Sequence, residues 1–97
     1  MDFYRWDHEK NERLKKERGV SFEQVVMHIE QGDLLGVYDH PNKVRYPGQQ
    51  VLVVKIEKYV YLVPFFEAQE GKFLKTIIPS RKATREFLGE ADEETES

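Results

Sequence analysis

The chain has 97 residues, with 18 acidic and 15 basic side chains, a net charge of -3 and no cysteine. This length supports one domain with a single modest core, and the lack of cysteine excludes disulfides, a thiolate nucleophile and metal sites that need cysteine. No apolar run approaches the ~20 residues of a membrane span and no secretory signal opens the chain, so we expect a cytoplasmic protein with no membrane partner.

The acidic residues are concentrated at the end of the chain. Residues 90–97 hold five of the eighteen acids, so residues 1–89 hold thirteen acids against fifteen bases. We therefore divide the chain into a single domain, residues 1–89, and an acidic tail, residues 90–97. The composition of the tail predicts disorder, and the alternative is an electrostatic mimic of RNA that shields a basic site.

Two helices are predicted near the start. Asp7 can cap a helix over residues 8–18, which is almost entirely polar, and Gly19 suits the left-handed residue that ends it. The second helix is better specified, because Ser21 and Gln24 match a capping box. The apolar residues that follow have the i, i+3, i+4, i+7 spacing of one buried face: Phe22, Val25, Val26 and Ile29.

Four strand-like runs, rich in Val, Ile, Tyr and Phe, come next: residues 34–38, 50–56, 59–65 and 72–78. Short connections between them require antiparallel hairpins, and Pro64 places the end of the third strand at an edge or a bulge. A last helix is expected after Ser80. The order α-α-β-β-β-β-α predicts an α+β domain, in which helices cover one face of a four-stranded antiparallel sheet and leave the other face free for recognition.

Three cations stand at the predicted start of the last helix: Arg81, Lys82 and Arg85. A helix N-terminus carries partial positive charge, so cations there are mildly unfavourable and indicate an anion, with phosphate as the obvious candidate. Arg81 has the best individual case, because a guanidinium can contact phosphate with two parallel hydrogen bonds. Ser80 is interpreted as the helix cap.

Further cations and aromatic residues lie on the first helix, in the long loop over residues 39–48 and on the fourth strand: Lys10, Lys15, Lys16, Arg18, His40, Lys43, Arg45, Tyr46 and Lys75. RNA cleavage without a metal needs a group that helps the 2′-hydroxyl attack, a cation that stabilises the phosphorane and a donor for the leaving oxygen. This set of residues can supply all three, with His40 and Tyr46 as candidates for proton transfer. Lys75 either lies beside the core or projects into a cleft.

Other kinds of site are not predicted. The three histidines have no metal-ligand spacing, and the chain has no glycine-rich phosphate loop and no Ser-x-Gly elbow. We therefore predict neither a metal nor a cofactor.

Three short segments occur in order along the chain: Phe3-x-x-Trp6-Asp7-x-x-Lys10-Asn11, Gly19-Val20-Ser21-Phe22-Glu23 and Ile78-Pro79-Ser80-Arg81-Lys82-Ala83-Thr84. Together they resemble the BrnT-type toxins of bacterial type II toxin–antitoxin pairs, and the resemblance spans residues 3 to about 88. It implies a RelE-like fold and a ribonuclease that inhibits translation and is neutralised by a cognate antitoxin. It leaves open a homodimer or a toxin–antitoxin hetero-oligomer.

The resemblance also sorts the residues of these segments. Lys10 and Arg81 carry over as functional residues, whereas Trp6, Phe22 and Ala83 carry over as packing residues and Ser21 and Ser80 as caps. Many members have Lys-His-Gly where this chain has Glu17-Arg18-Gly19, so a permanent cation replaces a histidine that could titrate. The chain is thus identified as a divergent member.

A second reading is a non-catalytic module of the same fold that binds RNA or protein. It is motivated by four aromatic residues of the kind that anchor interfaces: Tyr59, Tyr61, Phe65 and Phe66. Aromatic residues in strands more commonly lie in the core.

Overall fold

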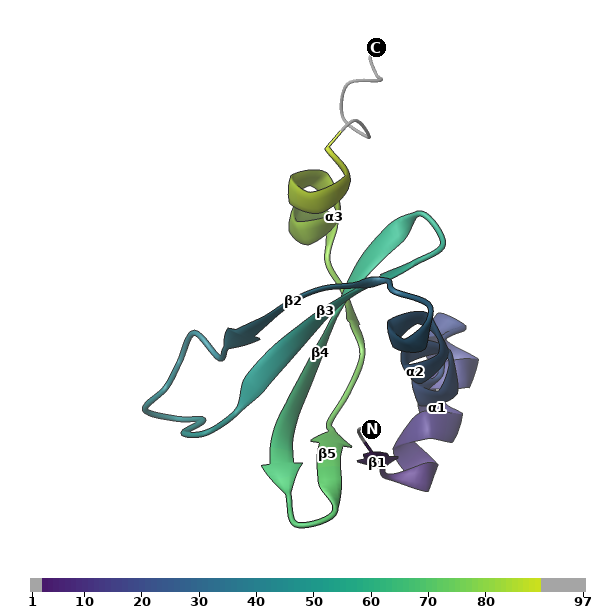
Figure 1. Cartoon of the computed structure of the whole chain (residues 1–97). Coiled ribbons are helices and arrows are strands. Elements are labelled where there is room, and N and C mark those ends of the chain that lie inside the picture. The colour runs from purple at the N-terminus through teal and green to yellow at the C-terminus, as the bar shows by residue number, and fades with distance from the viewer. Residues whose placement is uncertain (1–2, 90–97) are drawn as a thin grey trace.

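Figure 1 shows a computed structural model of the chain, which describes residues 3–89. The elements follow in the order β1 (Tyr4–Trp6), α1 (His8–Arg18), α2 (Phe22–Glu30), β2 (Leu34–Asp39), β3 (Gln50–Ile56), β4 (Tyr59–Ala68), β5 (Gly71–Leu74), β6 (Ile78–Pro79) and α3 (Arg81–Leu88). The predicted α+β class is confirmed, with three helices and a mixed sheet. The prediction about the acidic tail, residues 90–97, lies outside the described residues.

The helix boundaries follow from their caps. The side chains of Asp7, Ser21 and Ser80 each accept a hydrogen bond from a backbone N–H in the first turn of the helix that follows. Ser21 and Gln24 form both bonds of the predicted capping box, and Gly19 ends α1 with a φ of 70°. Local sequence therefore determines where these helices start.

The sheet has the strand order β1-β5-β4-β3-β2, and β6 also pairs with β4. The antiparallel pairs β2–β3, β3–β4 and β4–β5 agree with the predicted hairpins. Two further features make the prediction of a four-stranded, wholly antiparallel sheet incomplete: β1 pairs with β5 in parallel, and the run predicted over residues 72–78 is split into β5 and β6.

The split has its cause in the neighbouring strand. Lys75 N–H donates to the carbonyl of Pro64 at 2.8 Å, so the backbone polar groups of Pro64 face this edge of β4. Proline has no N–H to donate in return, and the ladder stops there. Pairing resumes beyond the gap, where Ser80 N–H donates to the carbonyl of Val60 at 3.0 Å. Ile77 turns into the core within the gap.

The parallel strand β1 is held at Gly71. A Cβ at this position would lie 2.3 Å from the carbonyl oxygen of Phe3, which itself accepts a hydrogen bond of 2.8 Å from Lys72 N–H. Only glycine permits this close approach, and its φ of 130° is also unfavourable for other residues. Gly71 therefore fixes the N-terminal strand against β5.

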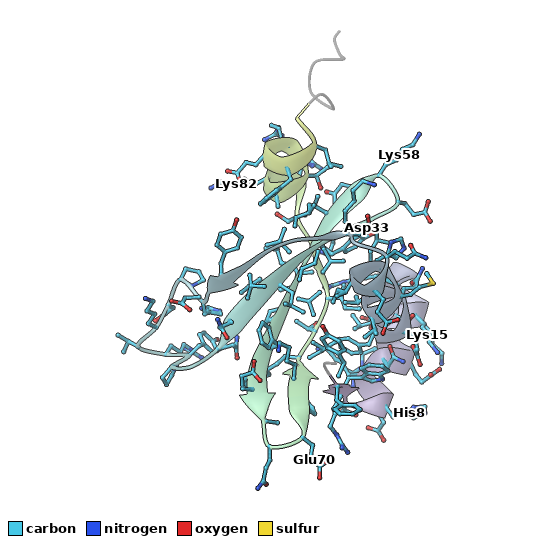
Figure 2. The ribbon with its side chains drawn as sticks, viewed as in Figure 1. His8, Lys15, Asp33, Lys58, Glu70 and Lys82 are labelled. Carbon is cyan, nitrogen blue, oxygen red and sulfur yellow. The ribbon has the colours of Figure 1, made fainter. Side chains whose placement is uncertain are left out.

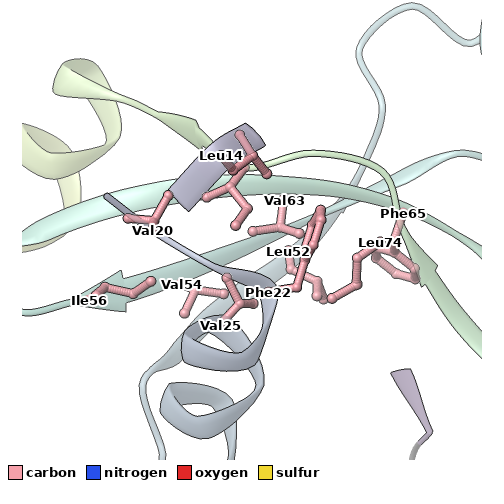
Figure 3. Packing of buried hydrophobic residues seen from close by; sticks show 11 residues of the cluster. Leu14, Val20, Phe22, Val25, Leu52, Val54, Ile56, Val63, Phe65 and Leu74 are labelled. Carbon is pink, nitrogen blue, oxygen red and sulfur yellow. The ribbon is translucent and has the colours of Figure 1, made fainter. Parts of the chain in front are cut away.

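The larger core lies between the sheet and the pair α1 and α2 (Figure 3). The helices and their junction contribute Leu14, Val20, Phe22 and Val25, and the sheet side contributes Leu52, Val54, Ile56, Val63, Phe65, Leu74 and Ile77. Trp6 stacks on Phe22 with ring centroids 5.6 Å apart. Period-2 alternation along β3 and β4 places this set of side chains on one face of the sheet.

The opposite face carries α3, which corrects the expectation that this face is entirely free. A smaller cluster joins Val53, Val60 and Ala83, with Leu35, Leu62 and Leu88 packed around it. Thr84 ties α3 to β4, because its hydroxyl accepts from Val60 N–H at 2.9 Å and donates to the Ser80 carbonyl at 2.7 Å. We call the part of this face that α3 does not cover the open face.

Candidate functional site

The sequence-predicted site residues fall into separate groups. Figure 1 places α1, the loop between β2 and β3, and α3 in three different parts of the molecule, and Figure 2 shows Lys15 and Lys82 on opposite sides. Lys10 and Arg81 therefore do not lie beside His40 and Tyr46. The sequence gives no signal of this separation, because it depends on the direction in which each hairpin leaves the sheet.

The α1 group comprises Lys10, Lys15, Lys16 and Arg18. Lys15 pairs with Glu12 at 3.1 Å, and this hydrogen bond raises the pKa of Lys15. Arg18 donates to the carbonyl of Ile77 and so ties the end of α1 to the gap between β5 and β6. The exposed cations of α1 lie on the helix layer rather than on the open face.

Asn11, which belongs to the first resemblance segment, has a structural role. Its fully buried side chain accepts from Phe22 N–H at 2.8 Å and donates to a Glu23 carboxylate oxygen at 2.8 Å. The bond from Asn11 is the main reason that the pKa of Glu23 lies below its ordinary value. Asn11 thus joins α1 to the first turn of α2.

The loop group comprises His40, Lys43, Arg45 and Tyr46, and the structure brings their side chains close together. The His40 and Tyr46 rings are 4.4 Å apart, the Arg45 guanidinium lies 5.6 Å from the Tyr46 ring centroid, and Lys43 pairs with Asp39 at 3.4 Å. His40 Nδ1 lies 3.0 Å from Asn42 N–H and accepts its hydrogen bond. A neutral His40 then carries its proton on Nε2, which makes this nitrogen a donor toward a ligand.

The open face combines aromatic rings with a cation. Phe66 and Phe73 stack with centroids 5.3 Å apart and an interplanar angle of 20°, and Lys75 Nζ lies 5.9 Å from the Phe66 ring centroid. Lys75 is exposed on this face, so its side chain does not lie beside the larger core. In a continuous strand, residues 73, 75 and 77 would all point to one face of the sheet. The strand ends at Leu74, so Lys75 still points to the face of Phe73, whereas Ile77 is buried in the core.

A groove of about 430 Å³ lies on the same face, between α3 and the sheet. Its lining combines apolar and polar side chains: Tyr38, Val53, Leu62, Ser80, Lys82, Ala83, Glu86 and Phe87. The Tyr38 ring lies over Gly36, where a Cβ would stand 2.6 Å from the ring. Sequence reasoning missed Tyr38 and Phe87, and the one usable signal was a glycine two residues before an aromatic residue in a strand.

The α3 group borders this groove. Lys82 lines it, Ser80 caps the helix, and the exposed Arg81 stands at the first helical position. Among residues 3–89, Arg81 and Lys10 take part in no ion pair or side-chain hydrogen bond. Both remain available to an anionic ligand.

Within residues 3–89 no three His, Asp or Glu side chains gather as a metal-binding group. His28 lies 2.8 Å from Asp33, a pair that joins the end of α2 to the start of β2. In the same range, no helix is long and apolar enough to cross a membrane.

Comparison with known proteins gives no match to the chain among family models, curated proteins or solved structures. The resemblance to BrnT-type toxins therefore depends on its three sequence segments.

Proposed function

We propose that the chain is the toxin of a bacterial type II toxin–antitoxin pair, a metal-independent endoribonuclease that cleaves RNA, inhibits translation and is neutralised by a cognate antitoxin in the cytoplasm. One observation carries the proposal. The polar residues of the three resemblance segments fall into two groups: some form hydrogen bonds that hold the fold, such as Asn11 and Ser80, and the cations Lys10, Arg81 and Lys82 take part in no ion pair or side-chain hydrogen bond among residues 3–89. Internal bonds do not account for these cations, whereas phosphate binding does.

The fold is compatible with this proposal. The helices α1 and α2 precede the antiparallel strands β2 to β5 and α3 follows them, as in the order that the resemblance implies, whereas the parallel strand β1 and the separate strand β6 depart from it. In our proposal, RNA lies on the open face. Arg81 and Lys82 at the positive end of α3, together with Lys75 beside the stacked Phe66 ring, bind its phosphates and bases.

In our proposal the phosphate that is cut lies at the loop group, and Arg81 holds the RNA at a second point. The 2′-hydroxyl attacks phosphorus and gives its proton to solvent, while His40 Nε2 donates a proton to the leaving 5′ oxygen. Tyr46 supports the imidazole ring, and Arg45 and Lys43 stabilise the charge on the phosphorane. Since the loop and α3 lie apart, an RNA must span both groups to contact them together. The remaining predicted contacts, from Lys10, Lys15, Lys16, Arg18 and Arg85, then bind phosphates of the RNA outside the open face.

The test is induced expression without the antitoxin, with growth curves and primer-extension mapping of cellular mRNA. We expect growth arrest and new 5′ ends with the wild-type chain and neither with Arg81→Ala. Arg13→Ala removes an exposed cation of α1 outside the proposed set and is the matched control. Unchanged growth with intact transcripts for the wild-type chain would contradict the proposal.

The separation of the predicted catalytic residues favours a second candidate, a non-catalytic module that binds RNA or protein through the open face. Exposed aromatic side chains suit such a role, with Phe66 on this face and Phe87 on the adjoining helix α3. The two candidates differ in one result. If Arg81→Ala abolishes toxicity while antitoxin binding survives, the binding-only candidate is rejected.

A further inference from the structure

The strand β2 ends the described sheet, with β3 as its one neighbour among residues 3–89. Its sequence Leu34-Leu35-Gly36-Val37-Tyr38-Asp39 has no proline and no lysine, the residues with which proteins commonly protect an exposed edge. Val37 is 44% exposed and Tyr38 is 52% exposed, although both are apolar strand residues. Each face of this edge therefore presents an uncovered apolar side chain.

The hydrogen-bond pattern shows which backbone groups face outward. His40 N–H donates to the carbonyl of Gln49 on the β3 side at 2.9 Å, and β2 pairs regularly from Gly36 to Asp39. Backbone groups alternate sides along a strand, so those of Tyr38 and Gly36 also face β3. The N–H and carbonyl of Val37 therefore point away from β3, toward the free edge.

We propose that a second copy of this chain pairs with β2 across a two-fold axis, antiparallel and centred on Val37. In an antiparallel pair, residues that stand opposite one another point to the same face of the sheet. A two-fold axis that relates two copies of one strand must therefore pass through a residue position, and not between two residues. Centring on Val37 lets its N–H and carbonyl bond to the same groups of the partner. It also places the two Val37 side chains directly opposite one another, a β-branched pair of the kind that stabilises sheets.

The other face of the edge fits the same register. Tyr38 stands opposite Gly36 of the second copy, and the Tyr38 ring already leans along its own strand over Gly36. In the dimer, the two Tyr38 rings therefore lean toward the two-fold axis on one face of the sheet. The two Val37 side chains point to the other face, so they leave room for the rings. An aromatic ring that covers a glycine of the adjacent strand is a recognised way to stabilise such a pair.

Charge does not oppose this pairing. Asp39 is the only charged residue of β2, and in the proposed register the two copies of Asp39 are four residue steps apart, or about 13 Å along the strands. Each is already paired with Lys43 of its own chain. The shift in pairing between Leu34 and Gly36 limits the regular edge to a few residues, which predicts a weak dimer in the micromolar range rather than an obligate one.

Sedimentation of the purified full-length chain from low micromolar concentration up to about 0.3 mM tests the proposal. We expect a reversible monomer–dimer equilibrium for the wild type, and a roughly tenfold or larger loss of dimer affinity for Val37→Lys. Val44→Lys is the matched control, since Val44 is 93% exposed in the loop beyond β2. A monomeric wild type at the highest concentration would overturn the proposal, as would equal dimerisation of Val37→Lys.

A second measurement uses the absence of cysteine from the chain. Paired residues at a hydrogen-bonded position have Cα atoms about 5.5 Å apart, within the range that a disulfide spans. We expect oxidised Val37→Cys to form a covalent dimer, and Tyr38→Cys, which faces Gly36 rather than itself, to form far less. Equal cross-linking of the two variants would overturn the register. Neither result depends on whether the chain cleaves RNA.

Discussion

The two faces of the sheet differ in how completely they are covered. On the face that α1 and α2 cover, eleven buried side chains form one cluster, and a buried asparagine joins the two helices. On the opposite face, α3 covers only the part around Val53 and Val60, and Tyr38, Phe66, Ile78 and Phe87 stay partly exposed. The first face holds the fold together, and the second keeps apolar and cationic groups accessible.

This difference distinguishes residues that stabilise the fold from residues that are available for binding. Residues of the covered face have their hydrogen bonds and contacts within the domain, so their loss should unfold it. Residues of the open face have fewer internal contacts, so their loss should change binding while leaving the fold intact. Each of the following experiments compares the two faces.

The largest effect is expected from Phe22→Ala. Phe22 is fully buried and stacks on Trp6, so its truncation leaves a cavity and should lower the free energy of unfolding by about 3–5 kcal/mol. Phe66→Ala is the counterpart on the open face, where the ring is 37% exposed, and should cost about 1 kcal/mol, the worth of one aromatic pair. Urea unfolding measures both. Equal losses would remove the distinction between the faces.

Asn11→Ala should have the next largest effect. It leaves the buried N–H of Phe22 and the Glu23 carboxylate without their partner, at a cost of about 2 kcal/mol. Glu17→Ala, an exposed change on the same helix, is expected within about 0.5 kcal/mol of the wild type. Thermal unfolding of the two variants compares them, and a neutral Asn11→Ala would show that α1 and α2 are joined by apolar packing alone.

On the face of the sheet that carries α3, Ser80→Ala removes the cap of this helix. The lost bond to Ala83 N–H should cost about 1 kcal/mol, and it should loosen α3 rather than the whole domain. Amide hydrogen exchange distinguishes these outcomes. Faster exchange confined to residues 81–88 is expected, whereas uniform acceleration over the sheet would mean that α3 is part of the main cooperative unit.

The smallest effect concerns pH and the covered face. Because the Asn11 bond lowers the pKa of Glu23 in the folded chain, the folded state binds fewer protons there than the unfolded state. The resulting stabilisation is present above the ordinary glutamate pKa of about 4.3 and is lost as the pH falls below it. Glu23→Gln keeps an acceptor for Asn11 but cannot titrate. The free energy of unfolding of the wild type, relative to that of Glu23→Gln, should therefore fall as the pH drops below about 4.3. A difference that does not change with pH would contradict the role of the Asn11 bond in lowering the pKa of Glu23.

The sequence predicts the covered face better than the open one. The capping box at Ser21 and the 3.6-residue spacing of Phe22, Val25 and Ile29 are local signals, and they specify α2 without reference to the rest of the fold. The three residues of β1 are too few to show a period. Its pairing depends on Gly71, some 67 positions after Tyr4 in the sequence, so no local pattern reports it.

The candidate site depends even more on long-range geometry. Composition identified the cations, and the proximity of His40, Arg45 and Tyr46 follows from their place in one loop. Whether that loop lies beside Arg81 depends on hairpin direction and on the interruption opposite Pro64, neither of which a linear pattern contains. The groove lined by Tyr38 and Phe87 was missed for the same reason, since β2 and α3 contribute one ring each.

RNA cleavage by the purified chain tests the central claim most directly. Labelled cellular mRNA is incubated in excess EDTA with the wild type, Arg81→Ala and the control Arg13→Ala, after circular dichroism has shown that all three are folded. The proposal predicts cleavage by the wild type and by Arg13→Ala, and its loss in Arg81→Ala. RNA that is bound by the wild type but stays intact, or cleavage unaffected by Arg81→Ala, would contradict it.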